Sequence, residues 1–158
     1  MTTPADDTPS ARRLLAVDFG EKRIGLALSQ GSLALPHSTI ARSSDAAAVA
    51  AIAEIVRDEG VTGLVVGEPR RLDGSAGDAV RRVHAFARRL EAATGLACTF
   101  VGEALTSRAA EERLRAAGVD PRRHPERVDQ VAAQLLLEEA LQREERAPSA
   151  AAPSGDDA

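Results

Sequence analysis

Three acidic residues occupy positions at which a carboxylate is poorly suited to packing and well suited to metal binding. Asp18 ends an apolar run that begins at Leu14, and Glu103 follows the apolar segment 96–101 by two residues. Asp129 lies on an apolar stripe of a predicted helix, where a charge is costly unless it is paired or bound to a metal. Hard cations such as Mg²⁺ prefer carboxylate oxygens. Strand ends and a facing helix can bring all three acids to one edge of a sheet, where they would form a divalent-metal site.

Each of these acids also has an ordinary structural interpretation. Asp18 can be a turn residue of an edge hairpin, Glu103 can lie in a solvated loop, and Asp129 can favour the positive end of its helix. Taken one at a time, the ordinary interpretation explains each residue about as well as metal binding does. It is their expected meeting at one edge that favours the metal site.

The segment around Asp18 predicts a β-hairpin over residues 14–29, because two apolar runs flank a short polar turn that contains glycine. The turn includes Lys22, the only lysine of the chain: of the 20 Lys and Arg residues, 20 − 1 = 19 are arginine. The use of lysine here, in a chain whose other cations are all arginine, can reflect a local requirement for a compact ammonium group. Chance explains it equally well.

The elements that must position these residues follow from the rest of the chain. After the hairpin we expect a strand near 32–41, a helix over 45–59, a strand over 61–67, a helix that opens at Ser75 and continues through Ala93, a strand over 96–101, a helix from Thr106 to Ala117 and a final helix from Pro125 to about Arg146. Three meandering strands followed by alternating helices and strands predict an α/β fold with a mixed sheet and helices on its faces.

Local signals set the expected ends of several elements. Pro36 interrupts the third strand, which suits an edge position. Ser44 can cap the first helix, and Gly60 can end it. The capping-box spacing of Ser75 and Asp78 predicts the start of the second helix, and Thr106 is expected to cap the third.

Length and charge predict one folded domain with two tails. A chain of 158 residues fits a single domain that buries roughly two-thirds of its unfolded surface. All 20 Lys and Arg residues lie between Arg12 and Arg146, a span that also holds 24 − 4 = 20 acidic residues, so its formal charge is zero. The net charge of −4 belongs to residues 1–10 and 147–158, whose composition predicts disordered acidic tails. We expect the folded domain to span residues 11–146.

The composition excludes several classes of protein. With three Phe and no Tyr or Trp, the core must be aliphatic, and bases cannot stack on Tyr or Trp. The single cysteine, Cys98, excludes an internal disulfide, fits a reducing cytoplasm and is more typical of a small core residue than of a nucleophile. We expect His37, His84 and His124, which lack metal-binding spacing, to be surface or hydrogen-bonded histidines. No apolar run approaches the ~18 residues of a membrane span, and residues 1–10 do not resemble a signal peptide.

Five segments resemble, in order, the successive motifs of the YqgF (RuvX) family, nucleases similar to Holliday-junction resolvases and built on the RNase H fold. The segments are VDFGEKRIGLA from Val17, VVGEP from Val65, DGS from Asp73, EALTS from Glu103 and VDQVAA from Val128. The resemblance covers roughly residues 13–145. Any one motif is weak evidence alone, whereas the ordered set at matching spacing is specific.

This resemblance implies a five-stranded RNase H-like mixed sheet flanked by helices and a metal-dependent phosphodiesterase site. The family's catalytic and metal-binding acids correspond here to Asp18, Glu103 and Asp129. It further implies a cytoplasmic hydrolase, a nuclease that processes the 5′ end of precursor 16S rRNA in ribosome biogenesis. Cleavage of DNA junctions is the alternative activity. The chemistry agrees, because Mg²⁺ or Mn²⁺ held by carboxylates can neutralise charge on a phosphate and activate a water molecule.

The expected partner is a structured nucleic acid, either precursor rRNA or branched DNA, and no membrane partner is expected. The protein is expected to be a monomer or a homodimer. Lys22 and Arg23 leave the hairpin turn, and Arg70 and Arg71 follow the strand over 61–67. We expect these four cations to flank the acids and to position the nucleic-acid backbone without reading its sequence. They can also be solvated loop charges, in which case the pair Arg122-Arg123 is the next candidate for phosphate contacts.

The chain departs from the family pattern at two places. The family usually has Asp-Glu-Arg where this chain has Gly102-Glu103-Ala104, so a flanking acid and a flanking cation are missing. The family also tends to have an apolar residue where this chain has Glu68. In related RNase H-like resolvases an acid at this strand end is a metal ligand, so Glu68 can supply lost charge or can be a loop residue beside Arg70 and Arg71.

Two other classes of function compete with the nuclease. Asp-x-Gly in a hairpin also opens the phosphate-binding motif of actin-like kinases and ATPases, but those proteins close two such domains around a nucleotide, and this chain has one. A catalytically weak module that binds nucleic acid or the ribosome is the other alternative, favoured by the altered Gly102-Glu103-Ala104 motif and the neutral core. Metal-dependent cleavage of RNA by the purified protein separates the nuclease from this module.

Overall fold

The structure, a computed structural model, describes residues 12–69, 77–103 and 106–146, with Glu103 described by its backbone alone. The predicted tails, residues 1–10 and 147–158, lie outside the described residues, as do Arg70 and Arg71. Within the described ranges, no helix is both long enough and apolar enough to cross a lipid bilayer.

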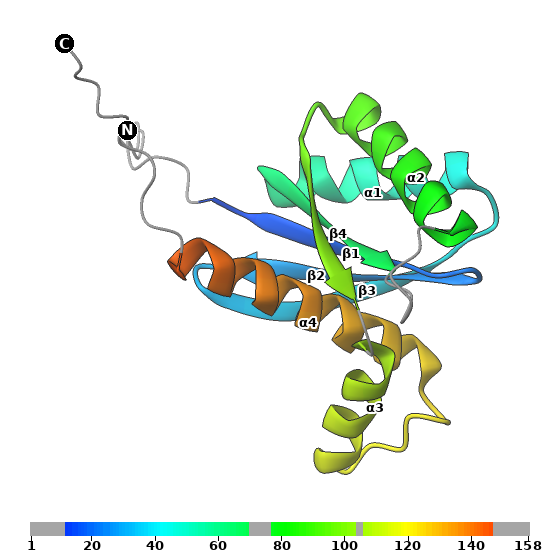
Figure 1. The fold of residues 1–158 in the computed structure, drawn as a ribbon, viewed down its shortest axis with the longest axis vertical. Helices are drawn as coiled ribbons and strands as arrows, with labels where there is room; N and C mark the ends of the chain where they lie inside the picture. The colour runs from blue at the N-terminus through cyan, green and yellow to red at the C-terminus, as the bar shows by residue number, and fades with distance from the viewer. Residues whose placement is uncertain (1–11, 70–76, 104–105, 147–158) are drawn as a thin grey trace, which may run out of the picture.

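Five strands and four helices make up the described part of the chain, in the order that the sequence predicts (Figure 1). They are β1 (Leu14–Phe19), β2 (Arg23–Gln30), β3 (Leu33–Ala41), α1 (Asp45–Glu59), β4 (Gly63–Pro69), α2 (Asp78–Thr94), β5 (Cys98–Glu103), α3 (Thr106–Ala116) and α4 (Pro125–Arg146).

The strands form one mixed sheet in the order β3-β2-β1-β4-β5. The first three strands meander antiparallel, whereas β4 runs parallel to both β1 and β5. The prediction of a mixed five-stranded sheet is therefore confirmed. The strand that contains Pro36 lies at the edge, as expected, and its register against β2 shifts between Leu26 and Ala27.

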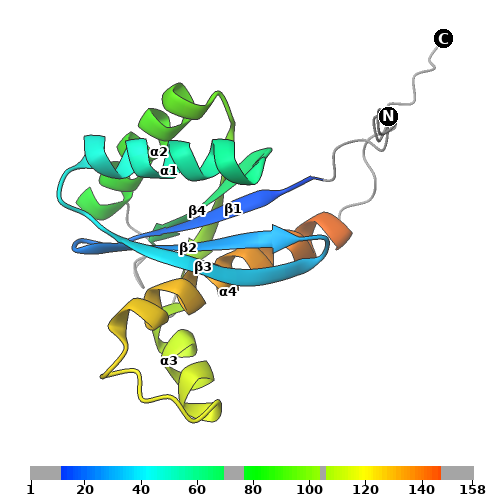
Figure 2. The same cartoon turned by 180° about the vertical axis from the view of Figure 1, so that it is seen from behind.

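Helices cover both faces of this sheet (Figures 1 and 2). On one face lie α1 and α2, which pack against alternate residues of the strands such as Leu15, Val17 and Ile24. On the other face lies α4, packed against the intervening residues such as Leu14, Ala16 and Ala27. The short helix α3 packs against α4 away from the sheet centre. The core is aliphatic, as the composition predicts, with Phe86 as its largest fully buried side chain.

Some predicted ends are confirmed and others are wrong. The Ser44 hydroxyl accepts a hydrogen bond from the Ala47 amide (3.1 Å), and Gly60 ends α1 in the left-handed region with φ 67°. Helix α2 begins at Asp78 and is capped by Gly77 without a side-chain hydrogen bond, so the predicted start at Ser75 is wrong. Thr106 is the first residue of α3 and not its cap.

Two strands both begin and end two residues later than the sequence predicts. Pairing with Gly102 and Glu103 extends β4 through Glu68 and Pro69, and the same pairing extends β5 to Glu103. The pairing of β4 with β1 ends at Val66, so β5 alone continues β4 through Glu68 and Pro69. Glu68 and Glu103 are therefore strand residues: the loop expected at Glu68 is wrong, and so is the loop alternative for Glu103.

Candidate active site

Asp18 lies near the carboxyl end of β1, directly opposite Gly25 of β2. Side chains alternate between the two faces of a strand, and Leu14 and Ala16 pack beneath α4. Asp18 shares their face. The hairpin therefore places this carboxylate, which is partly buried, on the side of the sheet that α4 covers.

Helix α4 meets this point of the sheet through its backbone. A Cβ atom added at Gly25 would overlap the carbonyl oxygen of Asp129 and would lie 2.8 Å from the Cβ of that residue. Only a residue without a side chain permits so close an approach. Because Gly25 is the cross-strand partner of Asp18, this contact brings the second acid beside the first.

Hydrogen bonds to β3 hold the start of α4 in place. The Thr39 hydroxyl donates to the carbonyl oxygen of Glu126 (2.6 Å) and accepts a hydrogen bond from the side-chain amide of Gln130 (3.1 Å). One turn further along, the Gln134 amide donates to the carbonyl oxygen of Ala34 (2.9 Å). These contacts flank Asp129 on both sides along the helix, so its position is set by the edge strand as well as by Gly25.

The carboxylate of Asp129 is paired with a cation from the hairpin. The Arg23 Nε atom donates to Oδ2 of Asp129 at 2.6 Å, and the Asp129 side chain is 19% exposed. Arg23 was predicted to contact phosphate, and this ion pair was not foreseen. The two residues are 106 positions apart, and no local pattern links them.

The third predicted acid, Glu103, ends β5, and its backbone pairs with Pro69 of β4. Since β4 lies between β1 and β5, the three parallel strands end on the same side of the sheet. The Glu103 side chain is outside the described residues, and the side chains that are described include no group of three His, Cys, Asp or Glu able to hold a metal. Convergence of all three carboxylates stays a prediction, whereas Asp18 and Asp129 lie on one face.

This donor set fits a hard divalent cation. Asp18 and Asp129 offer carboxylate oxygens, the ligand type that Mg²⁺ and Mn²⁺ favour. The guanidinium of Arg23 already occupies the Asp129 carboxylate, which shows that the position accommodates positive charge beside it.

The hairpin turn that carries Lys22 is fixed by Arg42, a residue that the sequence did not single out. Its guanidinium lies 4.2 Å from the centre of the Phe19 ring, donates to the carbonyl oxygen of Gly20 (3.3 Å) and pairs with Asp45 (2.9 Å). Its backbone amide donates to the carbonyl oxygen of Lys22 (2.9 Å). Lys22 itself is exposed. Twenty residues separate it from Arg42, so only the strand pairing reveals this support.

Glu68 lies on the opposite face of the sheet from Asp129. Its carboxylate pairs with Nε2 of His84 on α2 (2.5 Å), and the His84 ring stacks on Phe100 with centroids 4.2 Å apart. The carboxylate therefore serves a contact between β4 and α2, on the face away from α4.

The other candidate groups have structural partners. His37 and His124 each contact a glutamate, and His84 pairs with Glu68, as expected of satisfied histidines. Cys98 is partly buried against the core, and burial, with a smaller contribution from Glu91, raises the pKa of its thiol to about 12. A thiol that stays protonated at neutral pH is a poor nucleophile, in agreement with the predicted core role.

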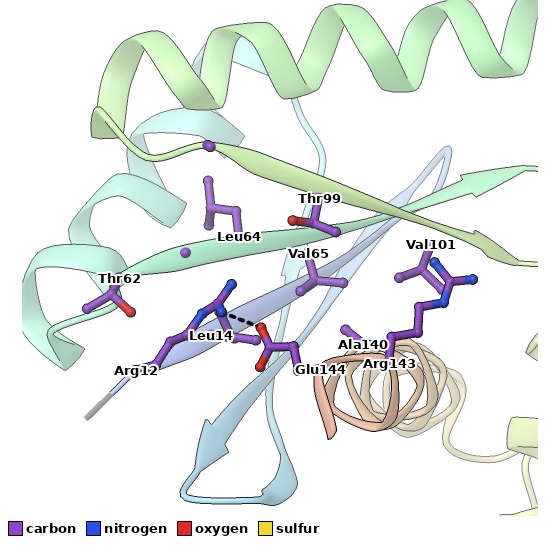
Figure 3. A pocket seen from close by; sticks show the side chains of 12 residues that line it. Arg12, Leu14, Thr62, Leu64, Val65, Thr99, Val101, Ala140, Arg143 and Glu144 are labelled. Carbon is purple, nitrogen blue, oxygen red and sulfur yellow. Dashed lines mark ion pairs between the residues drawn. The ribbon is translucent and has the colours of Figure 1, made fainter. Parts of the chain in front are cut away.

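A separate apolar hollow of about 280 Å³ lies at the amino ends of β1 and β4, away from the acids (Figure 3). Leu14, Val65 and Val101 line it from the sheet, and the last turns of α4 close one side. At its rim, Arg12 pairs with Glu144 (2.6 Å). Its lining lacks the carboxylates discussed above, so it belongs to a different end of the molecule.

The fold places this chain in a known structural class. Its structure is similar to that of "T. thermophilus RuvC in complex with Holliday junction substrate", with a TM-score of 0.57 over 85% of this chain and 96% of that one. A second structure of Thermus thermophilus RuvC gives a TM-score of 0.55 over 84% and 96% of the two chains. With sequence identities of 13% and 14%, these likenesses establish an RNase H-like fold of the RuvC type.

Sequence comparison narrows this class to one family. Residues 12–143 match the family model described as "RuvX: Holliday junction resolvase". Curated relatives named "Putative pre-16S rRNA nuclease" are 44% identical in Syntrophus aciditrophicus (82% of this chain, 87% of the relative) and 40% identical in Paracoccus denitrificans (89% and 90%). A third, from Anaeromyxobacter dehalogenans strain 2CP-1, is 44% identical over 86% of this chain and 99% of the relative. The chain therefore belongs to the RuvX family.

Proposed function

We propose that this protein is a metal-dependent endonuclease that cleaves precursor 16S rRNA at its 5′ end during ribosome biogenesis. The observation that carries the proposal is the contact of Asp129 with Gly25, the cross-strand partner of Asp18. This contact brings the backbone of Asp129 beside the strand position of Asp18, which supports a shared carboxylate site near the carboxyl ends of the parallel strands. Membership of the RuvX family and the shared name of the relatives support the choice of substrate.

The proposed metal ligands and catalytic residues are Asp18, Glu103 and Asp129. Bound Mg²⁺ or Mn²⁺ would neutralise charge on the scissile phosphate and lower the pKa of a water molecule. The protein's own contribution is to hold the acids in place: the hairpin fixes Asp18, β5 carries Glu103, and Gly25 together with the Thr39 hydrogen bonds fixes Asp129.

Substrate positioning is assigned to Lys22, Arg70 and Arg71, which follow β1 and β4 in the chain. Cations that follow strand ends in the chain suit contact with a phosphate backbone, whatever the base sequence. An rRNA-processing enzyme acts where ribosomes assemble, so we place the protein in the cytoplasm, as a monomer or a homodimer.

The direct test incubates the full chain with precursor 16S rRNA and with a synthetic four-way DNA junction, each with and without Mn²⁺. We expect Mn²⁺-dependent cleavage of the RNA, lost in Asp18→Asn and Asp129→Asn. Glu144→Gln is the matched control, because it removes a carboxylate of a similar ion pair at the other end of the sheet and should leave cleavage unchanged. Equal cleavage by all variants would contradict the assignment of the site.

DNA-junction cleavage is the second candidate function, since the family model itself is described as a Holliday junction resolvase. Metal-dependent cleavage of the four-way junction, with the RNA left intact, would favour it. Tight binding of either substrate without cleavage at any metal concentration would instead indicate a binding module, as the Gly102 and Ala104 departures suggest.

A further inference from the structure

Arg23 occupies the carboxylate that the proposed metal would need. Its Nε atom is 2.6 Å from Oδ2 of Asp129, within the range of a charge-assisted hydrogen bond. A divalent cation binds carboxylate oxygens at roughly 2.0–2.6 Å. The single contact of Arg23 leaves other lone pairs of the carboxylate open, but a metal ion on either oxygen would lie close to the guanidinium, and their positive charges would repel one another.

Of the two partners, Asp129 is the one that is fixed. Its backbone lies against Gly25, and the adjacent turns of α4 are tied to Thr39 and Ala34. Arg23 has its backbone fixed at the start of β2, where its carbonyl oxygen accepts a hydrogen bond from the Gly20 amide (3.0 Å). Its long side chain is 40% exposed and can turn into solvent without disturbing the sheet.

We propose that Arg23 is an internal counter-cation that neutralises Asp129 in the metal-free protein and is displaced when a divalent cation binds. The inference rests on the proposed function, because it takes Asp129 as a metal ligand. It explains why Arg23, expected to contact phosphate, is paired with an acid. Once displaced, the guanidinium remains at the rim of the site and is free to contact a substrate phosphate, which couples metal binding to nucleic-acid binding.

The first test compares the affinity of the full chain for Mn²⁺ alone, measured by titration calorimetry. Arg23→Gln removes the competing charge and should bind Mn²⁺ about tenfold more tightly, within the usual range of coupling between sites. Arg23→Lys keeps the competing charge, so its affinity for Mn²⁺ should stay within a factor of about three of the wild-type affinity. Arg12→Gln breaks an ion pair of the same length, remote from the acids, and should match the wild type. An Arg23→Gln affinity equal to or weaker than that of the wild type overturns the proposal.

A second measurement needs no substitution. In nuclear magnetic resonance spectra of the wild-type chain, the Arg23 Nε–H signal should move toward that of a solvent-exposed arginine as Mg²⁺ is added. The signal of Arg113, which pairs with Glu138 on α4, should stay in place. An Arg23 signal that does not move at saturating Mg²⁺ overturns the proposal, even if a variant fails to fold.

Two further variants separate the failure of this inference from the failure of the proposed function. If Asp18→Asn and Asp129→Asn bind Mn²⁺ as tightly as the wild type, the metal site itself is wrong, and the Arg23 proposal is overturned with it. If both variants lose Mn²⁺ binding while Arg23→Gln gains no affinity, the metal site is retained and only the role of Arg23 is wrong.

Discussion

At the scale of single residues, the site depends on one position that has no side chain. Gly25 lets the backbone of α4 rest on β2 beside Asp18, so an absent methyl group decides where Asp129 lies. The residue has no chemistry of its own and gains importance only from the helix above it. A sequence pattern can mark such a glycine as a break in a strand, but it cannot identify the helix that needs the space.

Replacing this glycine should therefore damage both stability and the site. In Gly25→Ala the new Cβ would overlap the backbone of Asp129, and neither backbone can yield easily. We expect the free energy of unfolding to fall by at least about 1–3 kcal/mol, as for overpacked cores, together with weaker Mn²⁺ binding.

Gly63→Ala is the matched control for this change, because its Cβ would meet only the end of the Leu14 side chain, at 3.0 Å. Urea unfolding and Mn²⁺ titration measure both effects. A Gly25→Ala protein as stable as Gly63→Ala would contradict the close packing of α4 on β2.

The thiol of Cys98 should be protected by the fold. Because burial raises its pKa to about 12 from 9.0, the native thiol stays protonated at pH 8, and alkylation by iodoacetamide should be much slower than in the urea-unfolded chain. Between pH 9 and the native pKa, the thiol of the unfolded chain loses its proton before the native thiol does. The free energy of unfolding should therefore fall as the pH rises through this range. Mass spectrometry measures the labelling rate, and native labelling as fast as unfolded labelling would contradict protection of this partly buried thiol.

At the scale of elements, β4 is joined to the helices on one face through a mixed polar and aromatic contact. Glu68 pairs with His84, and the His84 ring also stacks on Phe100 of β5, so a single α2 residue contacts two strands. The contact lies next to the point at which β4 ends. It therefore holds the strand from which the chain continues toward Arg70 and Arg71.

Two substitutions separate the parts of this contact. Glu68→Gln removes the carboxylate that pairs with His84, a partly exposed contact that should contribute about 0.2–1 kcal/mol. His84→Ala also removes the ring contact, so its loss of stability should be larger by about 0.5–1.5 kcal/mol. Urea unfolding at pH 6 measures both, and an equal loss in the two variants would mean that the stacking on Phe100 contributes nothing.

At the scale of the whole molecule, the order of elements could be predicted because each depends on local signals. Hydrophobic periodicity, Ser44 and Gly60 located α1, and Pro36 marked an edge strand. The later ends of β4 and β5 depend on pairing between strands about 35 residues apart, and no local pattern contains that information. The position of the acids on strand ends was foreseen, whereas the Arg23 and Asp129 ion pair requires the assembled fold.

The proposed nucleic-acid surface also belongs to the whole molecule. If Arg70 and Arg71 each bind a phosphate, the double variant Arg70→Ala/Arg71→Ala should bind RNA more weakly, and by a similar factor for RNAs of different sequence. The plot of log affinity against log salt should flatten by about 0.7–0.9 for each phosphate that the protein no longer neutralises. Arg122→Ala with Arg123→Ala is the matched control, and binding measured by fluorescence anisotropy checks both. An unchanged slope in the first variant and a flatter one in the second would move the surface to the Arg122-Arg123 turn.

The long separation between Arg23 and Asp129 has a consequence for the life of the polypeptide. Translation produces the hairpin first, and the helix that completes the site follows 106 residues later. A nascent, truncated or clipped chain without α4 leaves the face formed by Leu14, Ala16 and Ala27 uncovered. Exposed apolar surface marks a chain for chaperones and proteases. The docking of α4 therefore covers this apolar face and brings Asp129 into place in one step, so a copy without the helix both exposes the face and lacks one of the proposed catalytic acids.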